Sequence, residues 1–343
     1  MPIDVVTVTL NQHAVLRACL ESVRKAMEQV DGGEIVVVDN ASTDATPRML
    51  AEEFPEVRVV RNDANLFYTL AVNQGARATK SEFLFLLNDD TIMPPDLLRT
   101  LLDFMRAHPR CGAVGPVFQS PSGEPEVSSQ RHPTVLREIA IVTGLAYRLR
   151  DKPWAHRFVS QYPSPMPTMQ VDWVCGGAIL LRRKLMEELG LHDEGYLFYR
   201  DDPDIGRRVR DAGWEVWYCA ETRISHYQGK STARMAGKVD FDVISMRSRR
   251  HFHRKFHGFL GAAAVECADA VTMFVYCPFL FLRGDAAAAR RCWERFRALF
   301  RAFRPSAEER LAREAHRHAQ FNGLGADPGS APRAPAEGAS AHC

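Results

Sequence analysis

An apolar run, Phe83-Leu84-Phe85-Leu86-Leu87, is followed at once by the polar triplet Asn88-Asp89-Asp90. Consecutive large apolar residues without alternation are typical of a strand covered on both faces, as in a parallel sheet. Asn and Asp favour turns, so the triplet alone is equally compatible with a simple strand-to-helix connection. At a strand end, however, carboxylates are accessible and suit a hard cation such as Mg²⁺ or Mn²⁺.

Similar apolar runs occupy residues 5–8, 35–38 and 57–60, and helical periodicity separates them at 16–30, after Thr46-Pro47, and at 66–79. Strands that alternate with helices indicate an α/β fold with a mostly parallel sheet covered on both faces. Ligands in such sheets bind beyond the carboxyl ends of the strands. Asn11, Asp39 and the triplet at 88–90 all fall at that edge.

The second half of the chain is less regular at first. Residues 119–170 are rich in Pro, Ser and polar residues and predict a long excursion over the sheet. Regular structure returns at 171–181. We then expect a helix that ends at Gly190, a second helix over 204–212 and a strand over 215–219. We expect a first domain over residues 1–258, a helical extension over 259–322, and a disordered Gly/Pro/Ala/Ser tail over 323–343.

A second candidate site is Tyr199-Arg200-Asp201-Asp202-Pro203-Asp204. Carboxylates this close repel one another unless a cation or a catalytic demand holds them together. Asp204 has an ordinary explanation, because an acid at the start of a helix interacts favourably with the helix dipole. That explanation does not cover the adjacent pair, for which a base that accepts a proton from an attacking hydroxyl is the natural use.

The third candidate is His226, which follows a strand and a short loop. A lone histidine is more often an ordinary surface or core residue than a ligand. Its assignment therefore depends on the other two sites.

In this order, the motifs resemble family-2 glycosyltransferases over about residues 3–258. The segments similar to the nucleotide-binding half are Thr7-Val8-Thr9-Leu10-Asn11, Val38-Asp39-Asn40-Ala41-Ser42-Thr43-Asp44, Asn65 to Gly75, and Leu87 to Asp90. The segments similar to the acceptor half are Trp173 to Ala178, Asp193-Glu194, Asp201-Asp202 and Ala212-Gly213-Trp214.

The resemblance implies a GT-A (Rossmann-like) nucleotide-diphospho-sugar transferase fold, a divalent metal (Mn²⁺ or Mg²⁺), and inversion at the anomeric carbon. It implies a general base at Asp202. It also implies that Asp39 accepts a hydrogen bond from the nucleobase of the sugar donor. Metal ligands would be Asn88, Asp90 and His226, the histidine by similarity to polymerising galactofuranosyltransferases. Asn88 departs from the usual acid at its place, which makes Asp90 the safer ligand. The remaining donor contacts would be Thr9, Asn11, Asn65, Asn73 and Asp89. The remaining acceptor contacts would be Trp173, Gly176, Gly177 and Asp201.

Rhamnosyltransferases of surface polysaccharides share most of this pattern, so the donor sugar stays open. The acceptor is expected to be a saccharide or a lipid-linked saccharide. Two rival functions are a nucleotidyltransferase and a non-catalytic nucleotide-sugar-binding subunit. The first would show a Gly-rich, basic loop after its first strand, which Asn11-Gln12-His13 does not provide, and the retained Asp90 and Asp202 argue against the second.

Bulk charge predicts no nucleic-acid partner, because 44 Lys and Arg are balanced by 42 Asp and Glu in 343 residues. The eight cysteines are scattered without a C-x-x-C pair, as in a reduced cytosolic protein. The amino terminus has no signal-peptide pattern. These observations predict a cytoplasmic protein.

The basic surplus lies late in the chain, at 247–255 and 290–304, where it would suit phosphates or an anionic membrane. Within 286–304, Trp293, Phe296, Phe300 and Phe303 share one helical face among arginines, which predicts peripheral attachment to the inner face of the cell membrane. Residues 259–282 are long enough to enter lipid, although Glu266 and Asp269 argue against a full span. The alternative is a helical pair packed on the first domain or on a second copy in a homo-oligomer.

Overall fold

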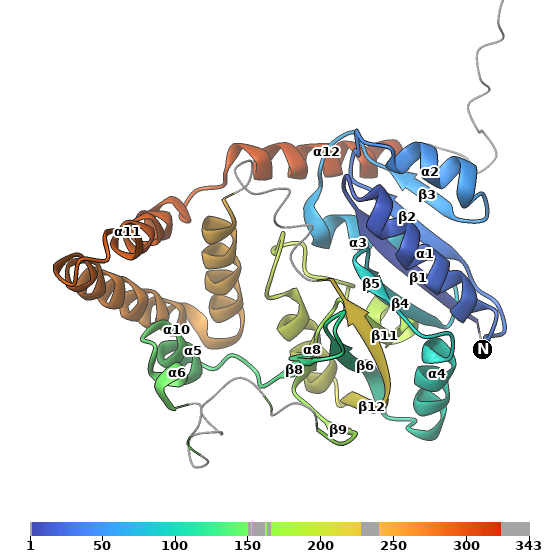
Figure 1. Ribbon diagram of the computed structural model, residues 1–343, viewed down its shortest axis with the longest axis horizontal. Helices are drawn as coiled ribbons and strands as arrows, with labels where there is room; N and C mark the ends of the chain where they lie inside the picture. Colours follow the sequence, from blue (N-terminus) through green and yellow to red (C-terminus); the bar gives the residue numbers. More distant parts are fainter. Residues whose placement is uncertain (1, 150–151, 153–161, 163–165, 228–239, 324–343) are drawn as a thin grey trace, which may run out of the picture.

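The computed structural model describes residues 2–149, 152, 162, 166–227 and 240–323 (Figure 1). The strands are β1 (Ile3–Thr9), β2 (Ile35–Asp39), β3 (Arg58–Arg61), β4 (Phe83–Asn88), β5 (Thr91–Ile92), β6 (Cys111–Gln119), β7 (Pro125–Glu126), β8 (Ser129–Gln130), β9 (Met169–Gln170), β10 (Trp173–Val174), β11 (Ala178–Arg182) and β12 (Glu215–His226). The helices are α1 (His13–Met27), α2 (Thr46–Glu53), α3 (Phe67–Arg77), α4 (Leu97–Ala107), α5 (Val135–Val142), α6 (Leu145–Leu149), α7 (Arg183–Glu188), α8 (Asp201–Asp211), α10 (Phe241–Leu282), α11 (Ala286–Arg301) and α12 (Ala307–Gly323).

Most of the described strands form one mixed sheet in the order β3-β2-β1-β4-β11-β6-β12-β5. The first four are parallel, and β11 enters antiparallel between β4 and β6. The parallel half places the carboxyl ends of β1, β2 and β4 at one edge, so Asn11, Asp39 and the triplet at 88–90 follow neighbouring strands as expected. The predicted α/β class is confirmed.

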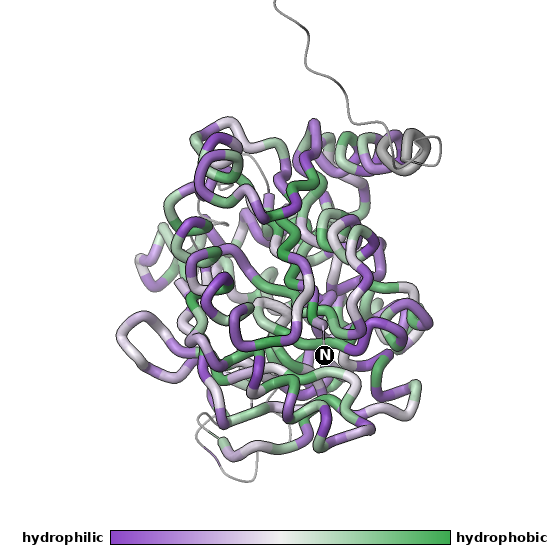
Figure 2. The backbone as a smooth tube through the Cα atoms, turned by 90° about the vertical axis from the view of Figure 1, so that its right-hand side faces the viewer, coloured by the Kyte–Doolittle hydropathy of each residue, from purple (hydrophilic) through white to green (hydrophobic). Residues whose placement is uncertain are grey.

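Side chains of the central strands alternate between two buried layers, as the pleat requires. Val5 and Phe85 face α1 and α4, whereas Val6 and Leu86 face α3, α7 and α8. Because helices cover both faces, the strands are apolar at nearly every position. Figure 2 shows these hydrophobic segments at the centre of the molecule.

Helix α8 begins earlier than the sequence indicates. Its first residue is Asp201 rather than Asp204, which places all three acids in its first turn. Tyr199 and Arg200 precede it with φ of 66° and 68°, in the left-handed region. For residues with a side chain this conformation costs about 1–2 kcal/mol each, so the surrounding structure must hold it.

The expected boundary after residue 258 falls within α10, which has a break at Gly258, where φ is 70° and ψ is −176°. Glycine adopts this backbone conformation readily, unlike the other residues. Across the break, Arg249 pairs with Asp269 and Arg250 pairs with Glu266. The two acids that argued against a membrane span therefore join the two parts of α10.

These ion pairs also revise the expectation for the basic run at 247–255. Arg247 pairs with Glu309 of α12, and Lys255 Nζ lies 2.6 Å from both Asp193 Oδ2 and Asp204 Oδ1. Much of this positive charge is thus used inside the protein rather than being free for an external phosphate.

Helix α12 returns across the parallel half of the sheet, above α3 in Figure 1. Ala312 packs in a cluster with Leu66, Phe67 and Leu70. Arg313 Nη1 donates to the carbonyl oxygen of Glu194 at 2.9 Å. The carboxyl-terminal end of the extension is consequently attached to the sheet domain.

Candidate functional site

A cleft of about 420 Å³ opens at the carboxyl ends of β1 and β4. Ten of the predicted site residues line it: Thr9, Asn65, Asn88, Asp89, Asp90, Gly176, Gly177, Asp201, Asp202 and His226. They come from segments more than 200 residues apart in the chain. The fold therefore brings the three candidate motifs to a single cavity.

One end of the cleft pairs a carboxylate with an imidazole. Asp90 Oδ1 lies 3.2 Å from His226 Nε2. Strand β12 causes this approach, because its last two residues pair antiparallel with β5, which directly follows Asp90. The backbone N–H of Tyr227 also donates to the Asp90 carbonyl at 2.8 Å. The sequence pattern places both residues at strand ends but does not reveal this pairing.

These two atoms fit a divalent cation. A carboxylate oxygen and an imidazole nitrogen this close together can both contact one ion, and Mn²⁺ accepts both donor types. No group of three His, Cys, Asp or Glu side chains in the described part of the chain forms a complete protein cage. Cations that work on phosphates are commonly held by one or two carboxylates together with substrate oxygens, so an incomplete protein set suits that use.

Asp89 and Asn88 have different surroundings from Asp90. The Asp89 Oδ2 accepts a hydrogen bond from Thr9 Oγ1 at 2.7 Å, which joins the ends of β1 and β4. The Asn88 side chain lies against Gly177, where a Cβ would come within 3.0 Å of Asn88 Nδ2. Both residues line the cleft, but only Asp90 makes the close approach to His226.

The other end of the cleft holds the acidic pair in the first turn of α8. Asp202 is partly exposed to the cleft, whereas Asp201 is only 5% exposed. Burial raises the pKa of Asp202 to about 6, although a hydrogen bond from the Gly176 backbone N–H opposes the shift. Burial and the neighbouring Asp202 carboxylate raise the pKa of Asp201 well above its usual range. Asp201 thus holds its proton more strongly, and Asp202 is the carboxylate of the pair at neutral pH.

His192 lies behind this pair, with its Nε2 3.9 Å from Asp201 Oδ2. Burial lowers the pKa of His192 to about 3, so the ring is neutral. It therefore supplies no positive charge that would ionise Asp201.

The turn between β10 and β11 separates the two ends of the cleft. A Cβ on Gly176 would lie 2.2 Å from Asp202 Oδ1, and a Cβ on Gly177 would approach Asn88. Side chains at these positions would displace the polar groups beside them. The two glycines are thus required by close packing against site residues.

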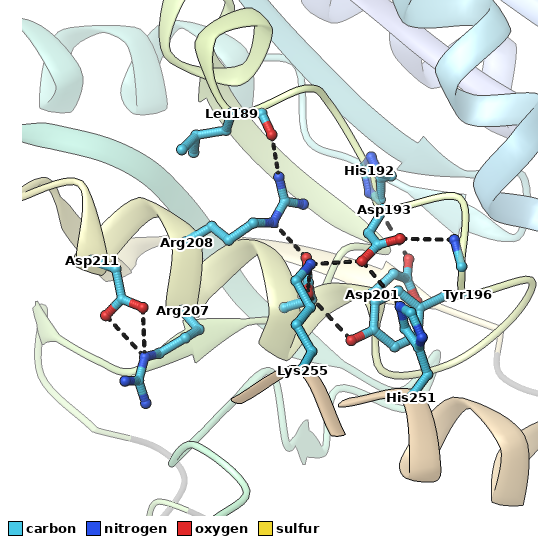
Figure 3. Close-up of polar contacts among 12 residues, drawn as sticks. Leu189, His192, Asp193, Tyr196, Asp201, Arg207, Arg208, Asp211, His251 and Lys255 are labelled. Carbon is cyan, nitrogen blue, oxygen red and sulfur yellow. Dashed lines mark hydrogen bonds and ion pairs between the residues drawn. The ribbon is translucent and has the colours of Figure 1, made fainter. Parts of the chain in front are cut away.

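Asp204 has a structural role, as its position suggested. Its Oδ1 accepts from Lys255 Nζ at 2.6 Å and from Tyr196 Oη at 3.2 Å, and Arg208 Nε donates to its Oδ2 at 2.5 Å. Figure 3 shows this network, in which Lys255 and His251 from α10 reach Asp193 and the start of α8. The network holds the amino-terminal end of α8 from behind.

Four predicted site residues do not line the cleft: Asn11, Asp39, Asn73 and Trp173. Asn11 Oδ1 accepts from the backbone N–H groups of Thr43 and Asp44 at 2.7 and 3.2 Å. Asn73 is fully buried and its amide bonds the backbone of His192. Both asparagines thus organise loops beside the cleft.

Asp39 is fully buried at the end of β2. Its Oδ1 accepts from the Ser42 N–H at 2.8 Å, and its Oδ2 lies 3.5 Å from Arg61 Nη1 without a hydrogen bond from any described group. Its neighbour Asn40 lines the cleft. An acceptor oxygen is therefore available one residue away from the cavity.

Trp173 packs against α8, where a Cβ on Gly206 would meet the Trp173 Cβ at 2.4 Å. Its Nε1 donates to the Arg131 carbonyl at 3.1 Å. Its observed contacts are with protein groups next to the acidic pair.

The sequence reasoning missed an aromatic wall of the cleft formed by Phe67, Tyr68, Phe198 and Tyr199. Tyr199 is the first residue of the acidic motif and Phe198 immediately precedes it, which was the available signal. Aromatic rings beside polar groups are typical of carbohydrate and nucleotide sites, because their faces bury well and their edges remain polar.

A family model described as "Glycosyl transferase family 2" matches residues 4–190. An N-acetylglucosaminyl-diphospho-decaprenol L-rhamnosyltransferase of Mycobacterium tuberculosis is 31% identical over 244 residues, which are 68% of this chain and 78% of that protein. An O-antigen biosynthesis protein of Myxococcus xanthus is 26% identical over 207 residues, 58% of this chain and 15% of that protein. Among solved structures, a mannosyltransferase from Pyrobaculum calidifontis in complex with GDP-Man and Mn²⁺ aligns with a TM-score of 0.52 at 18% identity, over 88% of this chain and 85% of that chain.

Proposed function

The chain belongs to glycosyl transferase family 2 and has the GT-A fold, and from this premise we propose that it transfers a sugar from a nucleotide-diphospho-sugar to an acceptor hydroxyl with inversion. One observation carries the proposal: a single cleft holds the Asp90–His226 pair at one end and Asp202 at the other. Family membership decides against a nucleotidyltransferase and against a non-catalytic subunit.

In this mechanism Asp202 accepts the proton of the acceptor hydroxyl as its oxygen attacks the anomeric carbon. The bond from that carbon to the donor phosphate oxygen breaks on the opposite face, which inverts the configuration without a covalent intermediate. Asp90 and His226 would hold a divalent cation, which neutralises charge on the leaving diphosphate. A pKa of about 6 makes Asp202 a stronger base than an ordinary carboxylate while leaving it ionised at pH 7.

The donor is proposed to occupy the side of the cleft formed by β1 and β4, with contacts from Thr9, Asn65 and Asp89. At the margin of the donor, Asp39 would contact the nucleobase, and Asn11 would act indirectly by holding the loop at 42–44. Asn73 would act indirectly, because it fixes the loop at His192. The acceptor would lie beside the Gly176-Gly177 turn, with Asp201 and Trp173 supporting Asp202 from behind.

We further propose that the transferred sugar is of rhamnosyl type and that the acceptor is a saccharide on a lipid diphosphate. The Mycobacterium tuberculosis relative, by its name, transfers L-rhamnose to N-acetylglucosaminyl-diphospho-decaprenol, and it is similar to this chain over 244 residues. An acceptor anchored in lipid would require the enzyme to work at the membrane face. We therefore assign residues 1–258 to catalysis and residues 259–322 to lipid contact and attachment.

The test of function is turnover on a donor panel. The purified full chain would be given nucleotide-diphospho-L-rhamnose, -galactofuranose, -mannose or -N-acetylglucosamine, with a short-chain N-acetylglucosaminyl-diphospho-prenol. We expect nucleoside diphosphate release that depends on the acceptor, fastest with L-rhamnose, and a product of inverted anomeric configuration by NMR. Retained configuration would exclude the mechanism, and transfer of a nucleotidyl group would exclude the function.

The proposal that the helical extension binds a membrane surface is supported by the distribution of exposed apolar side chains. Twelve of the twenty large hydrophobic residues exposed in the described chain lie between Phe259 and Phe303, and four more lie on α5 and α6. Helix α10 is, by length and composition, able to cross a bilayer, but its break and its internal ion pairs favour a helix lying against the surface. Exposed arginines of α11 stand beside these side chains, which suits an anionic lipid face.

Replacing Phe274, Phe279 and Trp293 together by Ser is expected to weaken binding to anionic vesicles by at least about tenfold. These side chains are 66%, 45% and 49% exposed, so the folded protein loses little packing, whereas insertion into lipid would bury each ring. Vesicle co-sedimentation of the full chain, with 30% phosphatidylglycerol, measures the effect.

A matched control replaces Val59, Val127 and Leu311, which are exposed elsewhere on the molecule, by Ser. This control should bind vesicles like the parent. Equal binding by both triple variants would remove the membrane role. A change in oligomeric state on light scattering, with vesicle binding unaltered, would assign the surface to a second copy of the chain instead.

A further inference from the structure

The acidic pair is preceded by a backbone turn that residues with side chains adopt only when they are held. Tyr199 and Arg200 are both left-handed, and the Arg200 carbonyl accepts the first hydrogen bond of α8, from the Asp204 N–H at 3.2 Å. The orientation of this turn therefore sets the direction in which α8 starts. Asp201 and Asp202, which come next, take their positions from it.

The backbone before this turn is tied to two helices. The Leu197 carbonyl accepts from the Tyr68 N–H of α3 at 3.2 Å, and the Phe198 carbonyl accepts from Ser248 Oγ of α10 at 2.8 Å. After the turn, the network around Asp204 fixes the helix (Figure 3). These contacts hold the flanks of the turn, whereas the left-handed residues need a contact of their own.

That contact comes from a helix of the excursion. Arg200 Nη2 donates to Glu138 Oε1 of α5 at 2.6 Å. The Glu138 side chain is 1% exposed and that of Arg200 is 24% exposed, so water screens the pair weakly. Burial tends to raise the pKa of Glu138, but Arg200, His253 and Arg249 outweigh it and lower the pKa to about 2. Glu138 is accordingly a carboxylate throughout the working pH range.

Other groups around Glu138 position it rather than replace Arg200. His253 Nε2 of α10 lies 3.7 Å from Glu138 Oε2, beyond hydrogen-bond distance. The amino terminus of α5 is capped by Thr134, whose Oγ1 accepts from the Arg137 N–H at 3.2 Å, and His257 Nε2 bonds the Pro133 carbonyl at 3.0 Å. Helix α5 is thus fixed against α10 and presents its one buried acid to Arg200.

We propose that Glu138 is a positioning residue for sugar transfer: through Arg200 it holds the left-handed turn that directs Asp202 at the acceptor hydroxyl. It does not line the cleft and has no contact with substrate to make. A buried ion pair adds little net stability compared with an apolar replacement, so its value here lies in the geometry that it imposes. The proposal rests on the function assigned above to Asp202.

Replacing Glu138 by Gln tests this, because the amide keeps the shape but removes the charge that holds the guanidinium. We expect kcat to fall about 10- to 100-fold, as for a small displacement of a catalytic group, with donor affinity unchanged within about twofold. Amide hydrogen exchange should accelerate in residues 196–204 and stay unchanged in β1 and β4. Arg200→Gln, at a partly exposed position, should give the same pattern and serves if the first variant folds poorly.

The control is Asp4→Asn. Asp4 pairs with Arg183 at 3.3 Å, both groups are buried, and they lie at the amino-terminal edge of the sheet, away from the cleft. This variant should lower the melting temperature without altering exchange at 196–204 or kcat. Unchanged exchange and unchanged kcat in folded Glu138→Gln or Arg200→Gln would overturn the proposal, as would an equal loss of kcat in Asp4→Asn. Faster exchange at 196–204 in Glu138→Gln than in the parent, together with a parent that transfers no sugar, would support the positioning contact and refute the assigned function instead.

Discussion

Asp202→Asn is expected to abolish sugar transfer while leaving the donor bound. The amide has nearly the same shape and can still accept a hydrogen bond from the Gly176 N–H, but it cannot take the proton of the attacking hydroxyl. Loss of a general base typically lowers the rate by about two to four orders of magnitude. We expect kcat to fall by that factor, with the affinity for the nucleoside diphosphate within about twofold of the parent.

Asp201→Asn provides the matched control on the adjacent residue. Because Asp201 is buried and its pKa is raised well above the usual range, it already behaves as a neutral group. Asn reproduces that neutral state, so the effect on kcat should be at least tenfold smaller than for Asp202→Asn. The reverse order would move the base by one residue, and near-parent activity in both variants would refute the proton transfer. Melting temperatures measured for both variants separate these outcomes from unfolding.

Removal of the cation, or of Asp90, is expected to cost about 100-fold in affinity for the nucleoside diphosphate. Neutralising the charge on two phosphate groups is worth several kcal/mol, and no lysine or arginine lines the cleft within the described residues. Among the described residues, the cleft therefore has no alternative positive group to take the place of the cation. Isothermal titration calorimetry with Mn²⁺, with Mg²⁺ and with EDTA measures this directly in the parent and in Asp90→Ala.

His226→Ala should lower the Mn²⁺-dependent affinity for the nucleoside diphosphate less than Asp90→Ala does. An imidazole carries no negative charge and so contributes less than a carboxylate to holding the cation. His226→Ala should also shift the preference from Mn²⁺ toward Mg²⁺, since Mg²⁺ favours oxygen ligands. Thr91, which pairs with His226 across β5 and β12, offers a control: Thr91→Ser keeps the hydroxyl and should bind as the parent does. If neither EDTA nor the Asp90→Ala substitution changes the affinity for the nucleoside diphosphate, the metal assignment is wrong.

The parallel half of the fold was predictable because its signals are local. Strands β2 and β4 are continuous apolar runs that end in a polar residue, and β1 is a mainly apolar strand that ends at Thr9. The parallel register brings these three carboxyl ends to one edge of the sheet. The strand end predicts a site at Asn88-Asp89-Asp90, and charge repulsion within a short segment predicts one at the pair Asp201-Asp202. The choice of Asp90 and Asp202 within these segments came from the resemblance to family-2 glycosyltransferases.

The remaining site details depend on contacts between distant segments, which no periodicity reports. His226 reaches Asp90 only because β12 extends to pair with β5, and Asn73 is occupied because the loop at His192 folds onto it. The start of α8 was placed three residues late because the left-handed turn at Arg200 is unfavourable for a residue with a side chain. Glu138 was not singled out, since a lone acid in a polar excursion gives no local signal.

The return of α12 determines when the parallel half of the sheet domain is completed during synthesis. Phe67, which lines the cleft, lies in a cluster that Ala312 closes, a separation of 245 residues along the chain. Translation proceeds from the amino terminus at about 5–20 residues per second, so more than about ten seconds pass between the synthesis of α3 and the synthesis of α12, which covers it. During that interval its apolar face stays open to other chains and to chaperones. Yield in cells should thus depend on residues beyond 300 more strongly than their distance in sequence from the chemistry would indicate.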